Sequence, residues 1–309
     1  MTIHDPARMA APSDLSETVQ DVLQQVESLM HDVVDSEVAV LRDASRHILS
    51  AGGKRVRPRL VLLAYAAAGG QHPEVAVPVA AAVELVHTAS VVHDDINDHG
   101  VVRRGRASIN AIWGRTFALL TGDYLFTKVY ELMAPHKDLN VILADATVAL
   151  VEGETLQASA VKNNNFTREI YYRIIALKTA ALFRSAATLG ARLAGGAPEH
   201  VEALGDFGYN IGLAFQIIDD VLDLTGDTER LGKTTGIDLE QGRGFAATYE
   251  QDVFAALKER VLQGDAVNEA HTQAEQLARL AIDQLASLPD SDAKDGLIDL
   301  AQLIVARNY

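Results

Sequence analysis

The sequence predicts an all-α protein, and three observations support this. Apolar residues recur at helical spacing along most of the chain, as in the stretch 19–33. We find no stretch of regular apolar–polar alternation, the pattern of a half-buried strand. Glycine pairs and prolines fall between the periodic stretches, where helices end and begin. We therefore expect one all-α domain over 1–309, a single-domain helical bundle around a central cavity, with 1–15 as a flexible N-terminal segment.

Most expected helices have a start or stop signal. The first covers 19–33, and the second, about 38–48, stops at a glycine pair. A third begins at Pro58 and ends at Gly69-Gly70, with proline in front and glycine behind. A long helix follows from about 75 to 98, before the loop HGVVRRGRA. Further helical patterns cover 108–133, 140–162, 168–194, 198–224 and three stretches after 245.

Composition excludes several classes of protein. The chain has 309 residues and no cysteine, so disulfides and thiolate chemistry are excluded and a reducing cytoplasm is expected. The N-terminus has no apolar signal-peptide core, and the longest apolar runs are too short or interrupted for a stable membrane span. A net charge of −15 argues against general binding of nucleic acid or anionic membranes.

Two aspartate clusters share the spacing DDxxD. One ends HTASVVHDDIND and the other lies in FQIIDDVLD, each after an apolar helix. Their members are Asp94, Asp95 and Asp98, and Asp219, Asp220 and Asp223. One cluster is explained about equally well as a solvated helix end, but two indicate a common cavity mouth. Carboxylates gathered there repel one another and need cations, and hard oxygen ligands favour Mg²⁺, which completes its shell with phosphate oxygens.

Basic residues flank both acidic clusters. GGKRVRPR holds Lys54, Arg55, Arg57 and Arg59 around a Gly-Gly turn, and VVRRGR follows the first aspartates. Lys178 interrupts the apolar stretch ALKTAALF. For any one of these groups, surface solubility is the commoner explanation. In so acidic a protein, their position beside both clusters favours capture of phosphate groups. No nucleotide-binding glycine motif is present.

Taken together, these motifs resemble trans-isoprenyl diphosphate synthases of the polyprenyl synthetase family. The likeness runs from about residue 20 to the C-terminus and is strongest to medium- and long-chain members such as octaprenyl diphosphate synthases. The motifs that carry it are GGKRVRP, ELVHTASVVHDDIND, RRG, GDYL, GETLQ, LKTAALF, FQIIDDVLD and GKTTGIDL.

The resemblance implies an isoprenoid (terpene) synthase fold, usually homodimeric, with both DDxxD motifs at the mouth of a deep cavity. It implies that an allylic diphosphate bridges the clusters through three Mg²⁺ ions, ionises, and is attacked by isopentenyl diphosphate to give an all-trans product. The resemblance also implies that the protein is a transferase of isoprenoid biosynthesis, located in the cytoplasm and without stable membrane insertion.

Residue roles carry over by position. The metal ligands implied are Asp94, Asp98 and Asp219, with Asp95 in support and Asp220 and Asp223 acting indirectly. The residues implied to bind the allylic diphosphate are Arg103, Lys178, Gln216 and Lys233, and Thr179 would lie beside the forming bond. Those implied to bind isopentenyl diphosphate are Lys54, Arg57, His87 and Arg104. His93 has no implied role and is expected to be structural.

Product length depends on the residues before the first aspartate cluster. Ala89 and Ser90, five and four positions before Asp94, are both small. Short-chain members commonly carry an aromatic residue there, so a deeper pocket and a product of about C30–C50 are expected. A lower floor could come from Phe126, Tyr130 or Met133.

Three alternatives stay open. The first is a short-chain farnesyl or geranylgeranyl synthase. The second, a terpene cyclase, is disfavoured because a cyclase needs no second diphosphate site. The third is a non-catalytic subunit of a heteromeric synthase. It is suggested by Arg243-Gly-Phe-Ala-Ala, where the family usually continues Lys-x-Thr-Leu-Pro, and by a short C-terminal tail.

Overall fold

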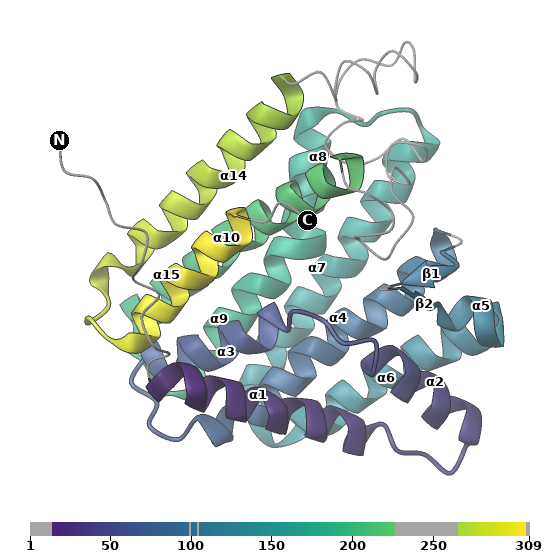
Figure 1. Cartoon of the computed structure of the whole chain (residues 1–309), viewed down its shortest axis with the longest axis horizontal. Coiled ribbons are helices and arrows are strands. Elements are labelled where there is room, and N and C mark those ends of the chain that lie inside the picture. The colour runs from purple at the N-terminus through teal and green to yellow at the C-terminus, as the bar shows by residue number, and fades with distance from the viewer. Residues whose placement is uncertain (1–13, 99, 104, 226–264, 307–309) are drawn as a thin grey trace.

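The computed structural model confirms the all-α prediction (Figure 1). It describes residues 14–98, 100–103, 105–225 and 265–306. The longer α-helices are α1 (Asp14–Val33), α2 (Ala39–Leu49), α3 (Val56–Ala67), α4 (Val77–Asn97), α6 (Arg115–Met133), α7 (Lys137–Lys162), α9 (Ala181–Leu193), α10 (Pro198–Thr225), α14 (Asp265–Gln284) and α15 (Asp292–Val305). The shorter elements are η1 (Pro73–Ala76), α5 (Ile109–Trp113), η2 (Ala134–His136), α8 (Arg168–Ile175), the π-helical turn η3 (Ala176–Ala180) and η5 (Leu285–Ser287).

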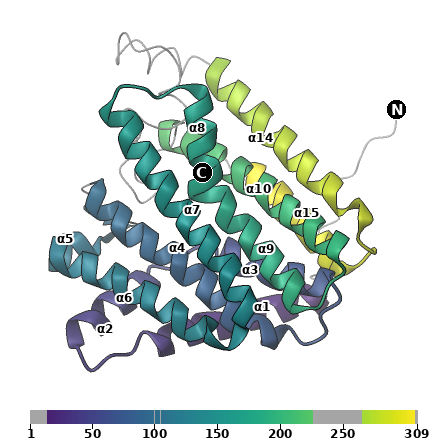
Figure 2. The ribbon, with the colours of Figure 1, turned by 180° about the vertical axis from the view of Figure 1, so that it is seen from behind.

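Helix α4 forms the centre of the bundle. It packs against α6, α1 and α3, and its residues from Val79 to Val83 have no exposed surface. The run of alanines there allows the surrounding helices to approach closely, and a helix that is apolar all round belongs in a core. Seen from behind, α4 lies among α6, α7 and α9 (Figure 2).

Within the described part of the chain, two stretches are long and apolar enough to cross a membrane, namely Pro73–Asn97 and Arg168–Leu193. Their apolar windows are 72% and 67% buried within the fold. That degree of burial is the one expected of core helices, which present their apolar surface to other helices rather than to lipid.

A second group of helices packs around α9 and α10. Helix α9 lies against α3, α7 and α10, and α10 lies against α14 (Figure 1). Glycines allow the closest approaches. A Cβ atom on Gly190 of α9 would lie 2.2 Å from the Val61 carbonyl oxygen of α3, and one on Gly208 of α10 would lie 2.6 Å from the Phe183 carbonyl oxygen. A side chain at either position would push the helices apart.

The structure corrects several predicted boundaries. The expected helix 108–133 is two helices that meet at Gly114, whose φ of 81° a side chain would strain. The expected helix 168–194 contains the π-helical turn η3, and the third helix begins at Val56 instead of Pro58. A short antiparallel hairpin, β1 (Val102–Arg103) and β2 (Arg106–Ala107), was not predicted. Of the three stretches expected after 245, α14 and α15 are described; 226–264 lie outside the described residues.

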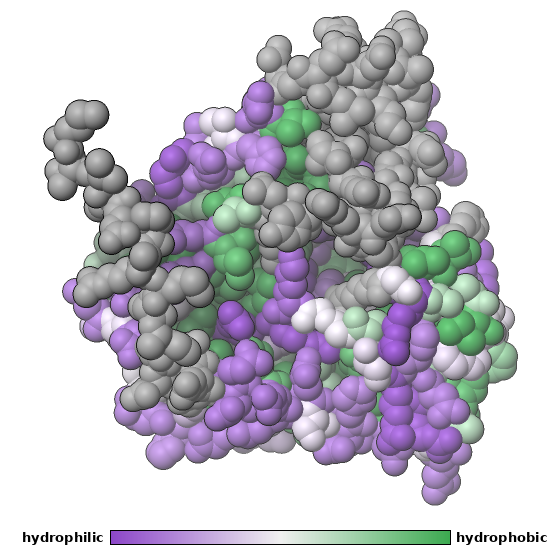
Figure 3. Space-filling view, in the orientation of Figure 1, coloured by the Kyte–Doolittle hydropathy of each residue, from purple (hydrophilic) through white to green (hydrophobic). Residues whose placement is uncertain are grey.

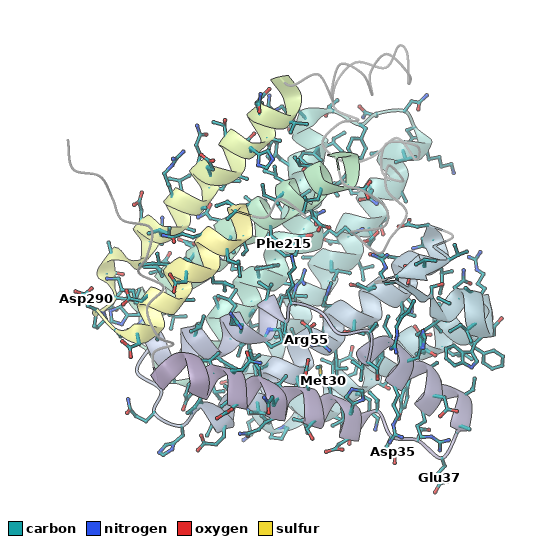
Figure 4. The ribbon with its side chains drawn as sticks, viewed as in Figure 1. Met30, Asp35, Glu37, Arg55, Phe215 and Asp290 are labelled. Carbon is teal, nitrogen blue, oxygen red and sulfur yellow. The ribbon has the colours of Figure 1, made fainter. Side chains whose placement is uncertain are left out.

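Arg55 is part of the core rather than of a surface basic cluster (Figure 4). Its backbone is left-handed, with φ 47°, at the residue before α3. The guanidinium donates to Glu84 at 3.0 Å, to Glu27 at 2.9 Å and to the Leu49 carbonyl oxygen at 3.1 Å. Burial acts to lower the pKa of Arg55, but the two glutamates outweigh it and raise that pKa. Arg55 therefore joins α1, α3 and α4, and the prediction that it belongs to an anion-binding cluster is wrong.

Candidate active site

Both aspartate clusters line one cleft. The first cluster lies at the C-terminal end of α4 and the second in the last turns described of α10. All six aspartates contribute to the lining, together with side chains from α3, α7, α8, η3 and α9. The cleft has a volume of about 210 Å³. The two DDxxD motifs, more than a hundred residues apart in sequence, thus face the same space.

Burial divides the six aspartates into two sets. Asp95, Asp220 and Asp223 are 3%, 5% and 3% exposed. The other three, Asp94, Asp98 and Asp219, are partly exposed. A carboxylate that is partly exposed in a cleft can exchange water for a cation more readily than one enclosed by protein groups. The three accessible aspartates are the same three to which the family resemblance assigns metal.

The accessible carboxylates fit a cation that binds together with its substrate. Over the described part of the chain, no three acidic or histidine side chains converge closely enough to hold an ion by themselves. Mg²⁺ usually takes only one or two carboxylates from the protein and completes its octahedron with water and phosphate oxygens. Three carboxylates spread around one cleft suit that mode better than a closed protein cage.

Lys178 joins the first cluster to a residue that the sequence analysis did not single out. Its Nζ lies 3.7 Å from the Asp94 carboxylate and contacts Glu154 of α7 directly. Burial, with a smaller contribution from Asp94, raises the pKa of Glu154 to about 7, although Lys178 acts to lower it. Glu154 belongs to the GETLQ motif, and a single glutamate in a helix gives no local sign that it faces a cleft.

A chain of hydrogen bonds crosses from η3 to the second cluster. The Thr179 hydroxyl donates to Gln216 Oε1 at 2.6 Å, and Gln216 Nε2 donates to Asp220 Oδ1 at 2.8 Å. The Tyr171 hydroxyl donates to Asp220 Oδ2 at 2.7 Å. Asp220 is thus held by protein donors on both oxygens.

Arg57 is held by aromatic rings. Its guanidinium carbon lies 4.7 Å from the centroid of Phe183 and 5.7 Å from that of Phe215. Such contacts stabilise a cation over the faces of the rings. Arg57 and His87 both line the cleft, whereas Lys54 is exposed and is not part of the lining.

The hairpin carries Arg103 to the first cluster, where it binds protein. Its Nε and Nη2 donate to Asp95 Oδ1 at 2.9 and 2.7 Å. Burial acts to lower the pKa of Arg103, but Asp95 outweighs it and raises that pKa. Arg103 also lines the cleft. Arg104 and Lys233 lie outside the described residues.

The two predicted chain-length positions differ. Ser90 lines the cleft, whereas Ala89 is fully buried. Of the candidate floor residues, Tyr130 is 64% exposed and points away from the core, while Met133 is fully buried. Phe126 packs against His93, with 5.9 Å between ring centroids. His93 lies between α4 and α6, and Gly122 leaves room for it, since a Cβ there would meet its Nε2 at 2.2 Å.

Comparison with known proteins decides the family. Residues 38–277 match the family model described as polyprenyl synthetase. The chain belongs to the polyprenyl synthetase family. It is 35% identical to octaprenyl diphosphate synthase of Escherichia coli, covering 94% of this chain and 97% of that one. It is 39% identical to heptaprenyl diphosphate synthase component 2 of Geobacillus stearothermophilus, covering 94% and 97%.

A solved structure agrees with this family assignment. Polyprenyl synthase from Caulobacter crescentus, complexed with calcium and isoprenyl diphosphate, matches with a TM-score of 0.89 and 32% identity, covering 98% of this chain and 100% of that one. Named relatives of this polyprenyl synthetase range from geranylgeranyl to decaprenyl diphosphate synthases. The chain is therefore a trans-prenyltransferase with the all-α isoprenyl synthase fold, and its product length is not fixed by relationship.

Proposed function

We propose that this enzyme condenses isopentenyl diphosphate with an allylic diphosphate, in a Mg²⁺-dependent reaction, to give an all-trans polyprenyl diphosphate. The observation that carries the proposal is the convergence of three accessible aspartates with Lys178, Arg57 and Arg103 on one cleft. Acidic and basic groups that face the same space suit a ligand that is itself a metal–diphosphate complex.

The roles follow from position. We assign Asp94, Asp98 and Asp219 to metal, which when bound neutralises the charge that develops on departing pyrophosphate. Lys178, Gln216 and Arg103 would bind the allylic diphosphate, and Arg57 and His87 isopentenyl diphosphate. Lys54, Arg104 and Lys233 keep their predicted substrate-binding roles on sequence grounds. Leu150, Leu182 and Phe215 would keep water from the cationic intermediate, since they supply apolar lining.

For product length we propose about C30–C50, because Ser90, which lines the cleft, and its buried neighbour Ala89 are both small and supply no aromatic floor on α4. One observation favours the short-chain alternative. The cleft of about 210 Å³ is smaller than the roughly 300–1,000 Å³ of ordinary ligand pockets, so a long tail must widen it.

We further propose a cytoplasmic homodimer built of one polyprenyl synthetase domain over 1–309. Large apolar side chains lie exposed on α5, α6 and α7, which are neighbours in the fold, and apolar residues gather at the edge where α5 lies (Figure 3). They include Ile112, Phe117, Leu120, Tyr130, Val141 and Val148. Exposed apolar surface of this kind usually marks an interface. The relative named as a synthase component favours a heteromer as the alternative.

One experiment tests the activity, the product and the alternatives together. The purified chain is incubated with Mg²⁺, labelled isopentenyl diphosphate and each allylic primer, and the products are sized. We expect chain elongation, no turnover in EDTA, rescue by Mg²⁺, and losses of orders of magnitude in Asp94→Ala and Asp219→Ala with the fold intact. Near-normal activity in either variant would refute the two-cluster mechanism. Inactivity of the wild-type chain that a second subunit restores would favour the heteromer.

A further inference from the structure

We propose that Tyr171 is a positioning residue for the reaction: acting through Asp220 and Gln216, it fixes which side of the Thr179 hydroxyl faces the cleft. The inference rests on the proposed function, in which Thr179 lies beside the forming bond. Tyr171 itself is not assigned any contact with the reacting atoms.

The three hydrogen bonds form one connection between η3, α10 and α8, in which the Tyr171–Asp220 bond is buried and the two bonds of the partly exposed Gln216 are part-buried. Tyr171 is 1% exposed, Thr179 4% and Asp220 5%. The donor–acceptor distances along the connection are 2.7, 2.8 and 2.6 Å. Replacing a short hydrogen bond that is wholly or partly shielded from water costs free energy, so the directions of these bonds persist.

The direction of every bond follows from Asp220. An ionised carboxylate only accepts, so both Tyr171 and Gln216 must donate to it. Because the Gln216 amide nitrogen turns toward Asp220, its oxygen turns toward Thr179. The Thr179 hydroxyl therefore donates its proton to Gln216, and the part of the hydroxyl that faces the cleft is its oxygen lone pairs. Near a cationic intermediate, an electronegative oxygen is the favourable end of that hydroxyl.

The backbone around Thr179 cannot easily move to compensate for a lost bond. Thr179 lies in the π-helical turn, and π-helical turns are often found at functional sites. Two glycines on neighbouring helices lie close against this turn. A Cβ on Gly153 would meet the Lys178 nitrogen at 2.7 Å, and one on Gly212 would meet the Ala180 Cα at 2.6 Å. With its backbone so enclosed, Thr179 depends on side-chain bonds for its hydroxyl orientation.

The primary variant is Tyr171→Phe, which keeps the ring contacts with Phe166 and Tyr172 and removes only the hydroxyl. Without that donor, the Asp220 carboxylate is held less firmly, and so is the direction of the Gln216 amide that donates to it. We expect kcat to fall about tenfold, the loss of one hydrogen bond to a charged group, and both KM values to change by less than about threefold. The matched control is Tyr172→Phe, the same change at the next residue. Tyr172 belongs neither to the hydrogen-bond chain nor to the cleft lining, so this variant should leave kcat unchanged.

A double-mutant cycle separates positioning from a structural role. Thr179→Val removes the hydroxyl, so adding Tyr171→Phe to it should cost little more. If the two losses in kcat multiply, Tyr171 does not act through Thr179 and the proposal is wrong. The thermal unfolding midpoint and calorimetric binding of inorganic pyrophosphate with Mg²⁺ should match wild type in Tyr171→Phe. If that variant unfolds, Gln216→Leu breaks the same connection and enters the cycle instead. Wild-type inactivity in prenyl transfer would refute the proposed function, whereas multiplicative losses in an active enzyme refute only the positioning role.

Discussion

Changing Glu84 to Gln is expected to destabilise the fold while sparing substrate binding. Glu84 is 3% exposed and accepts from Arg55, which is 8% exposed. The variant leaves a buried guanidinium without its buried counter-charge, and its other carboxylate partner, Glu27, is 47% exposed. Breaking a buried ion pair costs about 3–5 kcal/mol, and we expect the lower end because the amide oxygen still accepts a hydrogen bond.

This cost converts to a measurable shift in thermal stability. An unfolding entropy of about 2.1 cal/mol/K per residue gives about 0.65 kcal/mol/K for a domain of 309 residues, so 1 kcal/mol lowers Tm by about 1.5 °C. A loss of about 3 kcal/mol in Glu84→Gln should therefore lower Tm by roughly 4–5 °C. The comparison must be made at one protein concentration, because dimerisation adds to apparent stability. Replacing both partners, in Arg55→Met with Glu84→Met, should recover most of the loss, because no buried charge then remains unpaired.

The kinetic half of this prediction distinguishes Arg55 from its neighbour Arg57. Well below the melting temperature, Arg55→Met should leave the KM for isopentenyl diphosphate unchanged within about twofold, because its guanidinium is bound by Glu84, Glu27 and a carbonyl oxygen. A selective rise in that KM would show that Arg55 binds substrate. A Tm within about 2 °C of wild type in Glu84→Gln would show that the Arg55–Glu84 pair contributes less to the free energy of unfolding than a buried ion pair is expected to.

Three further predictions concern the cleft. Asp95→Asn weakens the hold on the hairpin and should raise the KM for the allylic substrate about tenfold, with little change in the Mg²⁺ concentration at half-maximal rate; a large rise in that concentration would make Asp95 a metal ligand. Arg57→Ala should raise the KM for isopentenyl diphosphate more than Lys54→Ala does, because only Arg57 of the two lines the cleft. The measurement is steady-state kinetics with the allylic substrate saturating, and a larger rise in Lys54→Ala would contradict the prediction. Ala89→Phe should shorten the product to about C15–C20 without abolishing activity, since it fills space beside the cleft; an unchanged product on sizing would show that the chain does not pass that residue.

The helices were predictable because their signal is local. Apolar periodicity located most of the described helices, and the alanine-rich stretch that became α4 was predicted as one helix ending in the first aspartate cluster. The π-helical turn at 176–180 was not predictable. It depends on Gly153 and Gly212, which belong to helices distant in sequence and admit the turn only when the bundle is assembled.

The site was predictable as a set of residues but not as a set of roles. DDxxD spacing makes the members of each cluster look alike, whereas burial separates Asp95 and Asp220 from their accessible neighbours. Likewise Arg55 and Arg57 stand two apart in one basic run. The left-handed backbone at Arg55 turns its side chain into the core, and nothing in a run of cations indicates that turn. Glu154 was missed because its partners come from α4 and η3.

Two of the cations predicted to bind diphosphate are already engaged by protein groups, and this has a consequence for how the ligands bind. Arg103 is held by Asp95, and Lys178 lies between Asp94 and Glu154. Lys178 can turn to a diphosphate at least cost if Asp94 binds another cation, because Asp94 would otherwise face the neighbouring carboxylates without a nearby positive charge. Binding of Mg²⁺ at Asp94 and binding of diphosphate at Lys178 should therefore favour each other, and by linkage the enhancement must be equal in both directions. The crowding of like charges at the end of α4 is, on this view, what ties the metal and the substrate into one binding event.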